Sequence, residues 1–104
     1  MMAVVVRSPR GMSQHAKRLA ALLDGESDHR IRFVDLCAIL VRLGFAERNS
    51  GGSHRIFFRR GIPEIINLQP RADGTAKPYQ ARQVRAIIFR YHLADRADSE
   101  ASDE

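Results

Sequence analysis

A histidine at the start of a predicted strand is the side chain in this sequence best suited to acid–base chemistry. His54 follows Gly51, Gly52 and Ser53 and precedes the run Arg55-Ile56-Phe57-Phe58-Arg59-Arg60. Imidazole exchanges a proton near neutral pH, and the flanking arginines could hold a polyanionic group beside it. A glycine pair before a strand lets the backbone turn sharply or approach another molecule closely. The simpler interpretation is an ordinary hairpin turn followed by a strand with one surface histidine.

The distribution of charge also favours a polyanionic partner. The chain of 104 residues carries a formal net charge of +5, and 15 of its 17 basic residues are arginine. Residues 45–93, which include His54, hold a net charge of +6, whereas residues 94–104 hold −4. Because arginine binds phosphate with two parallel hydrogen bonds, this basic segment predicts a nucleic acid or another phosphate-rich partner.

Cysteine content and the apolar segments limit the class of protein. Cys37 is the only cysteine, which excludes an internal disulfide and a multi-cysteine zinc site, and its apolar helical surroundings predict a buried side chain. The apolar run Met2-Ala3-Val4-Val5-Val6 stops at Arg7 and is too short for a signal peptide or a membrane span. We therefore expect a cytoplasmic protein that does not enter a membrane.

The spacing of apolar residues predicts three helices, over residues 13–24, 33–43 and 78–91. Ser13 fits an N-cap, and Pro78 suits the first turn of a helix. Gly25 and Gly44 follow the first two patterns and can end those helices. The third helix carries an apolar stripe with arginines outside it, so it is expected to be amphipathic with a basic outer face.

Three short runs between the second and third helices predict strands, over residues 45–48, 55–59 and 64–69. The connections are short and rich in glycine, asparagine or proline, as β-hairpins require. We therefore expect an α+β domain in the order helix, helix, strand, strand, strand, helix, with the helices packed on one face of a three-stranded antiparallel sheet. The other face is expected to be exposed and largely basic. Strand alternation separates Phe57 from Phe58, and which of them faces outward is left open.

We expect a single domain, because a chain of this length can bury only one core. We assign residues 13–93 to this domain. Residues 1–12 are turn-prone and basic and are expected to form a flexible lead-in. Residues 94–104 lack large apolar groups, so they are expected to be a disordered acidic tail.

Three short motifs carry a resemblance that composition and periodicity do not provide. They are Leu43-Gly44-Phe45, Gly52-Ser53-His54-Arg55-Ile56-Phe57 and Lys77-Pro78-Tyr79-Gln80-Ala81-Arg82-Gln83-Val84-Arg85. In order and spacing they resemble the HicA family of bacterial toxins, over roughly residues 13–93. Typical members of that family are shorter, and many have a second histidine where this chain has Arg55.

The resemblance implies a fold, an activity and a partner. It implies a fold like a double-stranded-RNA-binding domain and an endoribonuclease that cleaves mRNA, called an mRNA interferase. It further implies a HicB-like antitoxin that neutralises the toxin. His54 is implied to be the catalytic residue, in a site loop that includes Gly52 and Ser53.

RNA cleavage of this kind uses the 2′-hydroxyl of the substrate. A base removes the proton of that hydroxyl, an acid protonates the leaving oxygen, and cations stabilise the phosphorane; histidine is suited to the first two tasks. The residues that we predict to bind the RNA phosphates are Arg55, Arg59, Arg60, Lys77, Arg82 and Arg85. The alternative for each of these six residues is that it is an ordinary solvated cation on the protein surface.

Other chemistries fit the sequence poorly. The acidic residues of this region, Glu47, Glu64 and Asp73, lie apart, so we predict neither a metal site nor another cofactor. The expected partners are RNA and the HicB-like antitoxin, and a homodimer or a toxin–antitoxin hetero-oligomer is left open. The alternative function is a non-catalytic module that binds structured RNA by shape and phosphate contacts, in which His54 is one more polar contact.

Overall fold

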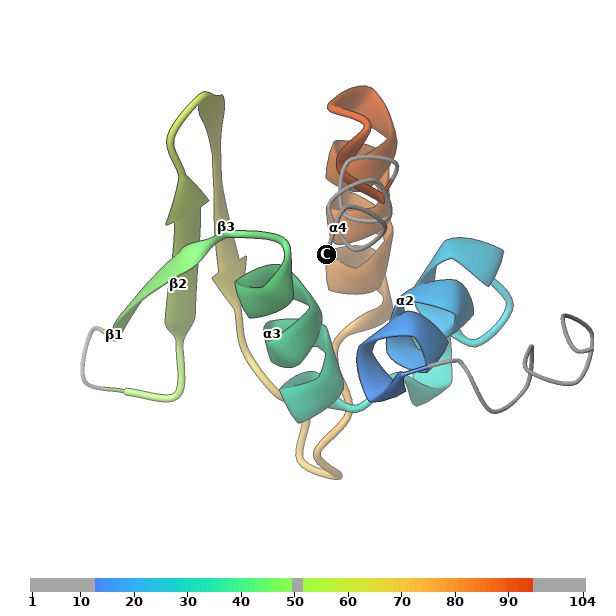
Figure 1. The fold of residues 1–104 in the computed structure, drawn as a ribbon. Helices are drawn as coiled ribbons and strands as arrows, with labels where there is room; N and C mark the ends of the chain where they lie inside the picture. The colour runs from blue at the N-terminus through green and yellow to red at the C-terminus, as the bar shows by residue number, and fades with distance from the viewer. Residues whose placement is uncertain (1–12, 50–51, 95–104) are drawn as a thin grey trace, which may run out of the picture.

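The computed structural model describes residues 13–49 and 52–94 of the chain. Over these residues it contains three α-helices, one short 3-10 helix and a three-stranded antiparallel sheet, with the helices gathered on one side of the sheet (Figure 1). In chain order the elements are α2 (Gln14–Asp24), η1 (Asp28–Arg30), α3 (Phe33–Arg42), β1 (Ala46–Asn49), β2 (Arg55–Arg59), β3 (Ile62–Leu68) and α4 (Pro78–Arg90). The α+β class expected from the sequence is therefore confirmed.

The predicted ends of the domain fall largely outside the described residues. Neither the predicted lead-in, residues 1–12, nor residues 95–104 of the predicted acidic tail belong to the described part. Ala94, which the sequence analysis assigned to that tail, packs against the core beside the buried Leu93.

Local signals at the helix ends act as expected. The Ser13 hydroxyl accepts a hydrogen bond from the Ala16 backbone N–H at 3.0 Å and so caps α2. Gly25 ends the same helix with a φ of 79°, and Gly44 follows α3 with a φ of 93°. These left-handed conformations favour glycine, because a side chain there would strain the backbone.

The three strands pair in the order β1-β2-β3, so β1 and β3 form the edges of the sheet. The predicted start of the third strand at Glu64 is wrong by two residues, since β3 begins at Ile62. The reason is a tight turn at Arg60 and Gly61, in which Gly61 has a φ of 89°. Pro63 is tolerated inside β3 because an edge strand has a side that needs no hydrogen-bond donor.

Burial shows which face of the sheet packs on the helices. Phe57 is completely buried, whereas Phe58 is 38% exposed. By alternation, Arg55 and Arg59 share the inner face of the sheet with Phe57. The prediction that the outer face is largely basic is therefore wrong. The outer face instead carries the apolar or aromatic side chains of Ile56, Phe58 and Ile65, together with Arg48, whose guanidinium carbon lies 5.8 Å from the centre of the Phe58 ring.

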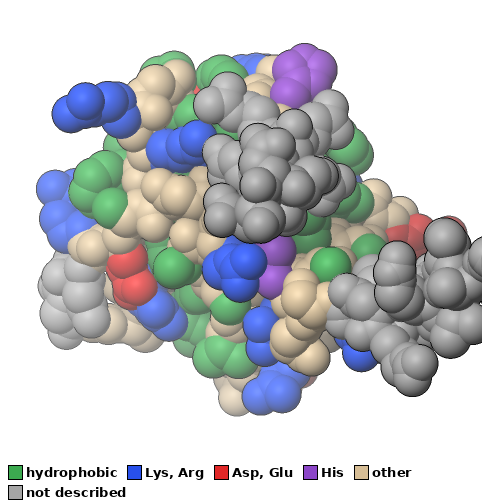
Figure 2. Space-filling view, in the orientation of Figure 1, with side chains coloured by type: hydrophobic (Ala, Val, Ile, Leu, Met, Phe, Trp, Pro, Cys, Tyr) green, Lys and Arg blue, Asp and Glu red, His purple; other side chains and the backbone are tan. Residues whose placement is uncertain are grey.

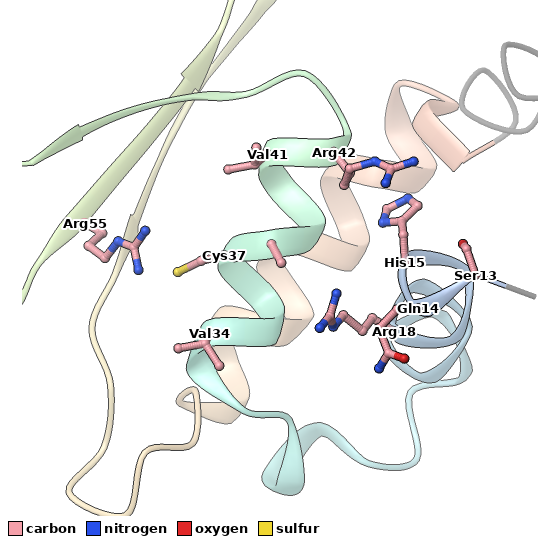
Figure 3. A pocket seen from close by; sticks show the side chains of 10 residues that line it. Ser13, Gln14, His15, Arg18, Val34, Cys37, Val41, Arg42 and Arg55 are labelled. Carbon is pink, nitrogen blue, oxygen red and sulfur yellow. The ribbon is translucent and has the colours of Figure 1, made fainter.

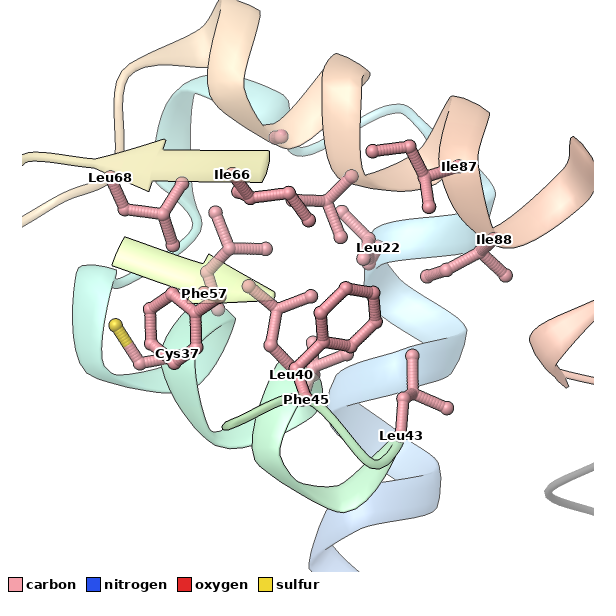
Figure 4. Packing of buried hydrophobic residues seen from close by; sticks show 14 of the residues in the cluster. Leu22, Cys37, Leu40, Leu43, Phe45, Phe57, Ile66, Leu68, Ile87 and Ile88 are labelled. Atoms are coloured by element: carbon pink, nitrogen blue, oxygen red, sulfur yellow. The ribbon is translucent and has the colours of Figure 1, made fainter. Parts of the chain in front are cut away.

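One core joins the sheet to all three helices (Figure 4). Its completely buried side chains include Phe57, Ile66 and Leu68 from the strands, with Leu22, Leu36, Leu40 and Val84 from the helices. Cys37 is also buried, as predicted, and its burial raises the pKa of the thiol to about 11. Within the described residues, no helix has the length and apolar character needed to cross a membrane.

Candidate active site around His54

His54 is exposed at the start of β2, on the outer side of the sheet. Its Nδ1 lies 3.0 Å from Oδ1 of Asn67 in β3. The antiparallel register explains this contact, because Ile56 is paired with Asn67 and His54 lies two residues before Ile56 on the same side of the strand. With the Asn67 oxygen as acceptor, Nδ1 carries the proton and donates it. In the neutral form of this tautomer Nε2 has a lone pair, as a general base needs.

A pocket of about 270 Å³ adjoins His54. Its walls come from the outer face of β3, the residue that follows β3, and the first two turns of α4. The side chains that line it with His54 are those of Ile65, Asn67, Gln69, Tyr79, Gln80 and Gln83. None of these described residues is a lysine, arginine, aspartate or glutamate, so the pocket is polar but carries no permanent charge.

The buried amide of Gln80 holds this pocket together. Gln80 is only 2% exposed, although it is polar. Its hydrogen bonds are satisfied when its oxygen accepts from the Gln69 N–H and its nitrogen donates to the Gln69 carbonyl, both at 3.2 Å. This pair of hydrogen bonds fastens the start of α4 to the end of β3, and therefore fixes the distance between the two walls.

Arg55 is drawn to the inner side of the sheet, away from the His54 imidazole. Its Nε and Nη2 donate to the two carboxylate oxygens of Glu47, the second at 2.6 Å. These hydrogen bonds lower the pKa of the Glu47 carboxyl. The guanidinium carbon also lies 5.7 Å from the centre of the Phe33 ring and 5.8 Å from that of Phe57. Arg55 therefore has a structural role in joining β1, β2 and α3.

Two further predicted RNA-binding residues, Arg59 and Arg85, are half-buried and form hydrogen bonds within the protein. Arg59 Nη1 donates to the carbonyl of Leu43 at 2.7 Å, at the C-terminal end of α3, where a cation is favourable. Arg85 donates to both carboxylate oxygens of Asp28 and to the carbonyl of Leu22. Neither guanidinium lies in the pocket beside His54.

The other three predicted RNA-binding residues, Arg60, Arg82 and Lys77, are not gathered at one site. Arg60 is exposed in the turn after β2, roughly 20 Å along the hairpin from His54 at the usual rise per residue. Arg82 is exposed on α4. Lys77 lies next to the pocket, since its Nζ is 3.4 Å from Oε1 of Gln69. Figure 2 shows lysine and arginine side chains scattered over one face of the protein, with no single basic patch there.

Gly52 and Ser53 are both exposed and lead into His54, as the predicted site loop requires. A side chain added at Gly52 would meet no atom within 4 Å. The structure thus places the site loop and Lys77 close to the pocket, and it places Arg55, Arg59, Arg60 and Arg85 elsewhere. The six side chains that line the pocket with His54 were not predicted as site residues: Ile65, Asn67, Gln69, Tyr79, Gln80 and Gln83.

A larger cavity of about 500 Å³ lies over α3 and does not include His54 (Figure 3). Its apolar floor is formed by Val34, Cys37, Ala38 and Val41, and α2 forms one wall. Because the pKa of the Cys37 thiol is raised to about 11, little reactive thiolate exists there at neutral pH. Cys37 is therefore a poor nucleophile in this cavity.

In residues 13–49 and 52–94, no group of three or more histidine, cysteine, aspartate or glutamate side chains is placed so that it could hold a metal ion. Four acidic residues of the described part, Asp28, Asp35, Glu47 and Glu64, each form an ion pair with an arginine. No protein-family model, no curated protein and no solved structure matches this chain.

Proposed function

We propose that this protein is an RNA-cleaving toxin of the HicA type that uses His54 as its acid–base residue. The observation that carries the proposal is the exposed imidazole whose Nδ1 is fixed by Asn67 at the mouth of a pocket. The motifs around Gly44, His54 and Pro78 support the family. The order of α3, three antiparallel strands and α4 supports a fold like a double-stranded-RNA-binding domain, with α2 as an addition before it.

The proposed reaction is attack of an RNA 2′-hydroxyl on the adjacent phosphorus. Nε2 of His54 takes the proton of the hydroxyl, the 2′-oxygen bonds to phosphorus, and the bond from phosphorus to the 5′-oxygen breaks. The leaving 5′-oxygen takes a proton from a water molecule, and the protonated His54 returns its proton to the hydroxide that is left, so the products end in a 2′,3′-cyclic phosphate and a 5′-hydroxyl. Asn67 keeps the ring in one tautomer and one orientation, which a general base requires.

Positive potential near His54 comes from Lys77 and from the start of α4. Lys77 precedes α4 and reaches Gln69 at the rim of the pocket. The positive end of the α4 dipole favours a phosphate there. This arrangement supplies fewer cations than the sequence suggested, so catalysis is expected to depend on positioning as much as on charge.

A HicB-like antitoxin is the proposed partner, and we place its contact over His54 and the adjoining pocket. Covering an exposed imidazole is the simplest way to silence an enzyme that has one acid–base residue. Because Lys77 lies near this surface, the complex is expected to weaken as the salt concentration rises.

A non-catalytic RNA-binding module is the rival function, and one observation favours it. Arg48 and the exposed Phe58 form a cation and aromatic pair on the outer face of the sheet, which suits RNA contact without any chemistry. Both functions predict RNA affinity that falls with salt.

Analysis of RNA products separates the two functions. Purified protein is incubated with a defined RNA in the presence of a metal chelator, and the new ends are identified by mass spectrometry. The proposed enzyme yields 2′,3′-cyclic phosphate ends, and RNA in which the 2′-hydroxyls are replaced by hydrogen stays intact. Intact RNA together with a shifted band on a gel would instead establish the binding module.

A further inference from the structure

The chemistry of the pocket beside His54 suits a neutral, flat, polar group. The described residues that line it include four amides, those of Asn67, Gln69, Gln80 and Gln83, and none of the lining residues is a lysine, arginine, aspartate or glutamate. A pocket built for phosphate would be expected to carry cations. An amide presents both donors and an acceptor, which is the pattern that the edge of a nucleobase requires.

Apolar surface in the same pocket suits the face of a base. Tyr79, in the first turn of α4, is 56% exposed, and Ile65, on the outer face of β3, is 54% exposed. A base between them can stack on the tyrosine ring and pack against the isoleucine. The volume of about 270 Å³ is large enough to take one nucleobase.

We infer that this pocket binds one unpaired nucleobase, and that the protein therefore acts on single-stranded RNA. The inference rests on the proposed function in that it takes RNA as the ligand. In a duplex the base edges are paired and the faces are stacked on neighbours, so neither the amides nor Tyr79 could reach them. The nucleotide held in the pocket lies beside His54, so its base selects which phosphate is presented to the imidazole.

The pocket is built before any ligand arrives. The buried Gln80 fastens α4 to the end of β3, and Lys77 contacts the Gln69 amide from outside. The Asn67 oxygen is used by His54, which leaves the Asn67 amide nitrogen to donate to a base. Base recognition and orientation of the imidazole are therefore coupled through one side chain, and a bound base with an acceptor at that position would favour the productive orientation.

Binding measurements with three labelled oligonucleotides test this inference on the full chain. The first is a short RNA single strand, the second is the same strand in a blunt duplex, and the third keeps the backbone but lacks every base. All carry 2′-fluoro groups, which remove the nucleophile and prevent cleavage. At one fixed salt concentration we expect the single strand to bind at least about fivefold more tightly than either of the others, the lower end of the range for stacking one base on an aromatic side chain.

Variants assign the preference to the pocket. Tyr79→Ala is expected to remove the preference while leaving the affinity for the base-free strand unchanged, and Tyr79→Phe is expected to keep it because the ring remains. Gln83→Ala is expected to weaken binding of the single strand only. Phe89→Ala is the matched control, because Phe89 is 57% exposed on the same helix but does not line the pocket. Thermal unfolding checks that each variant folds.

The outcomes distinguish this inference from the proposed function. Equal affinity of the three oligonucleotides for the wild-type protein would overturn the base pocket, even if the protein cleaves RNA. A Phe89→Ala variant that loses the preference as completely as Tyr79→Ala would overturn it too. A preference that depends on Tyr79, in a protein that leaves natural RNA uncut, would support the pocket and refute the enzyme. Absence of binding to every oligonucleotide would refute both.

Discussion

Removing the guanidinium of Arg85 is expected to destabilise the protein far more than it weakens RNA binding. Arg85 Nη1 donates to Asp28 Oδ1 at 2.8 Å and to the Leu22 carbonyl at 2.9 Å, and Nη2 donates to Asp28 Oδ2 at 2.9 Å. These hydrogen bonds join α4 to the end of α2 and to η1. The Arg85 and Asp28 side chains are only 17% and 14% exposed, so the variant Arg85→Ala leaves a carboxylate and a carbonyl poorly solvated.

The size of this effect follows from the type of contact that is lost. Hydrogen bonds to charged groups contribute about 1.5–3 kcal/mol each, and breaking a buried ion pair costs about 3–5 kcal/mol. Because the remaining exposure admits some water to Asp28, we expect a loss of about 2–3 kcal/mol in the free energy of unfolding. In a domain of this size, about 1 kcal/mol lowers Tm by about 4–8 °C, so the expected fall in Tm is roughly 10–20 °C.

Circular dichroism during thermal unfolding measures this loss, with Arg82→Ala as the matched control. Arg82 is exposed on the same helix, so its replacement is expected to change the free energy of unfolding by less than about 0.5 kcal/mol. A double-mutant cycle of Arg85→Ala with Asp28→Asn isolates the pair. An Arg85→Ala variant that keeps the wild-type Tm but binds RNA weakly would refute the structural role and restore the RNA-binding role.

The pH dependence gives the same experiment a second readout. The hydrogen bonds from Arg85 lower the pKa of the Asp28 carboxyl below its ordinary value of 3.8. An acid whose pKa is lowered in the folded state stabilises that state above the unfolded pKa, and this stability is lost as the pH falls through the folded pKa. The difference in stability between the wild type and Arg85→Ala should therefore be full at neutral pH and shrink below about pH 4. A difference that stays constant down to acidic pH would contradict the pairing.

Three smaller changes test other parts of the structure. Labelling of Cys37 by a thiol reagent at pH 8 should be slow until the protein is unfolded, because with a pKa of about 11 roughly one thiol in a thousand is ionised; rapid labelling of the folded protein would contradict its burial. Glu47→Gln should lower the free energy of unfolding by at most about 1 kcal/mol at pH 7, and by less below about pH 4, because the paired Glu47 carboxyl has a lowered pKa. Asn67→Ala should slow RNA cleavage by about tenfold at saturating RNA, because the imidazole loses its orienting contact; an unchanged rate at saturating RNA would remove Asn67 from the site.

The parts of the fold that depend on local signals were predictable from the sequence. Ser13 at the start of α2 and Gly44 after α3 act within one helical turn, so their roles can be found by spacing alone. The start of β3 was missed because the turn at Gly61 is shorter than the run of turn-forming residues suggested. The choice between Phe57 and Phe58 as the buried ring depended on packing against the helices, which the alternation of one strand cannot supply.

The candidate site was only partly predictable for a related reason. His54 carries a local motif, whereas its partner Asn67 lies 13 residues away and is brought near by the register of the hairpin. Tyr79 and Gln83 join the pocket only because α4 packs beside β3. Arg85 was expected to contact RNA because nothing in its own segment reveals Asp28, which is 57 residues distant in sequence. Partners across such separations require the folded chain.

Cleavage of RNA by His54→Ala, compared with the wild type and with His29→Ala, tests the central claim most directly. Both histidines are exposed, so neither change should lower Tm appreciably, and His29 lies in η1, outside the pocket. One positioned imidazole contributes about 10²–10⁴-fold to a rate. We therefore expect the His54→Ala variant to cleave RNA at least about 100-fold more slowly, with RNA affinity retained, and the His29→Ala variant to cleave it at the wild-type rate. Cleavage at the wild-type rate by a folded His54→Ala protein would show that His54 is not the catalytic residue.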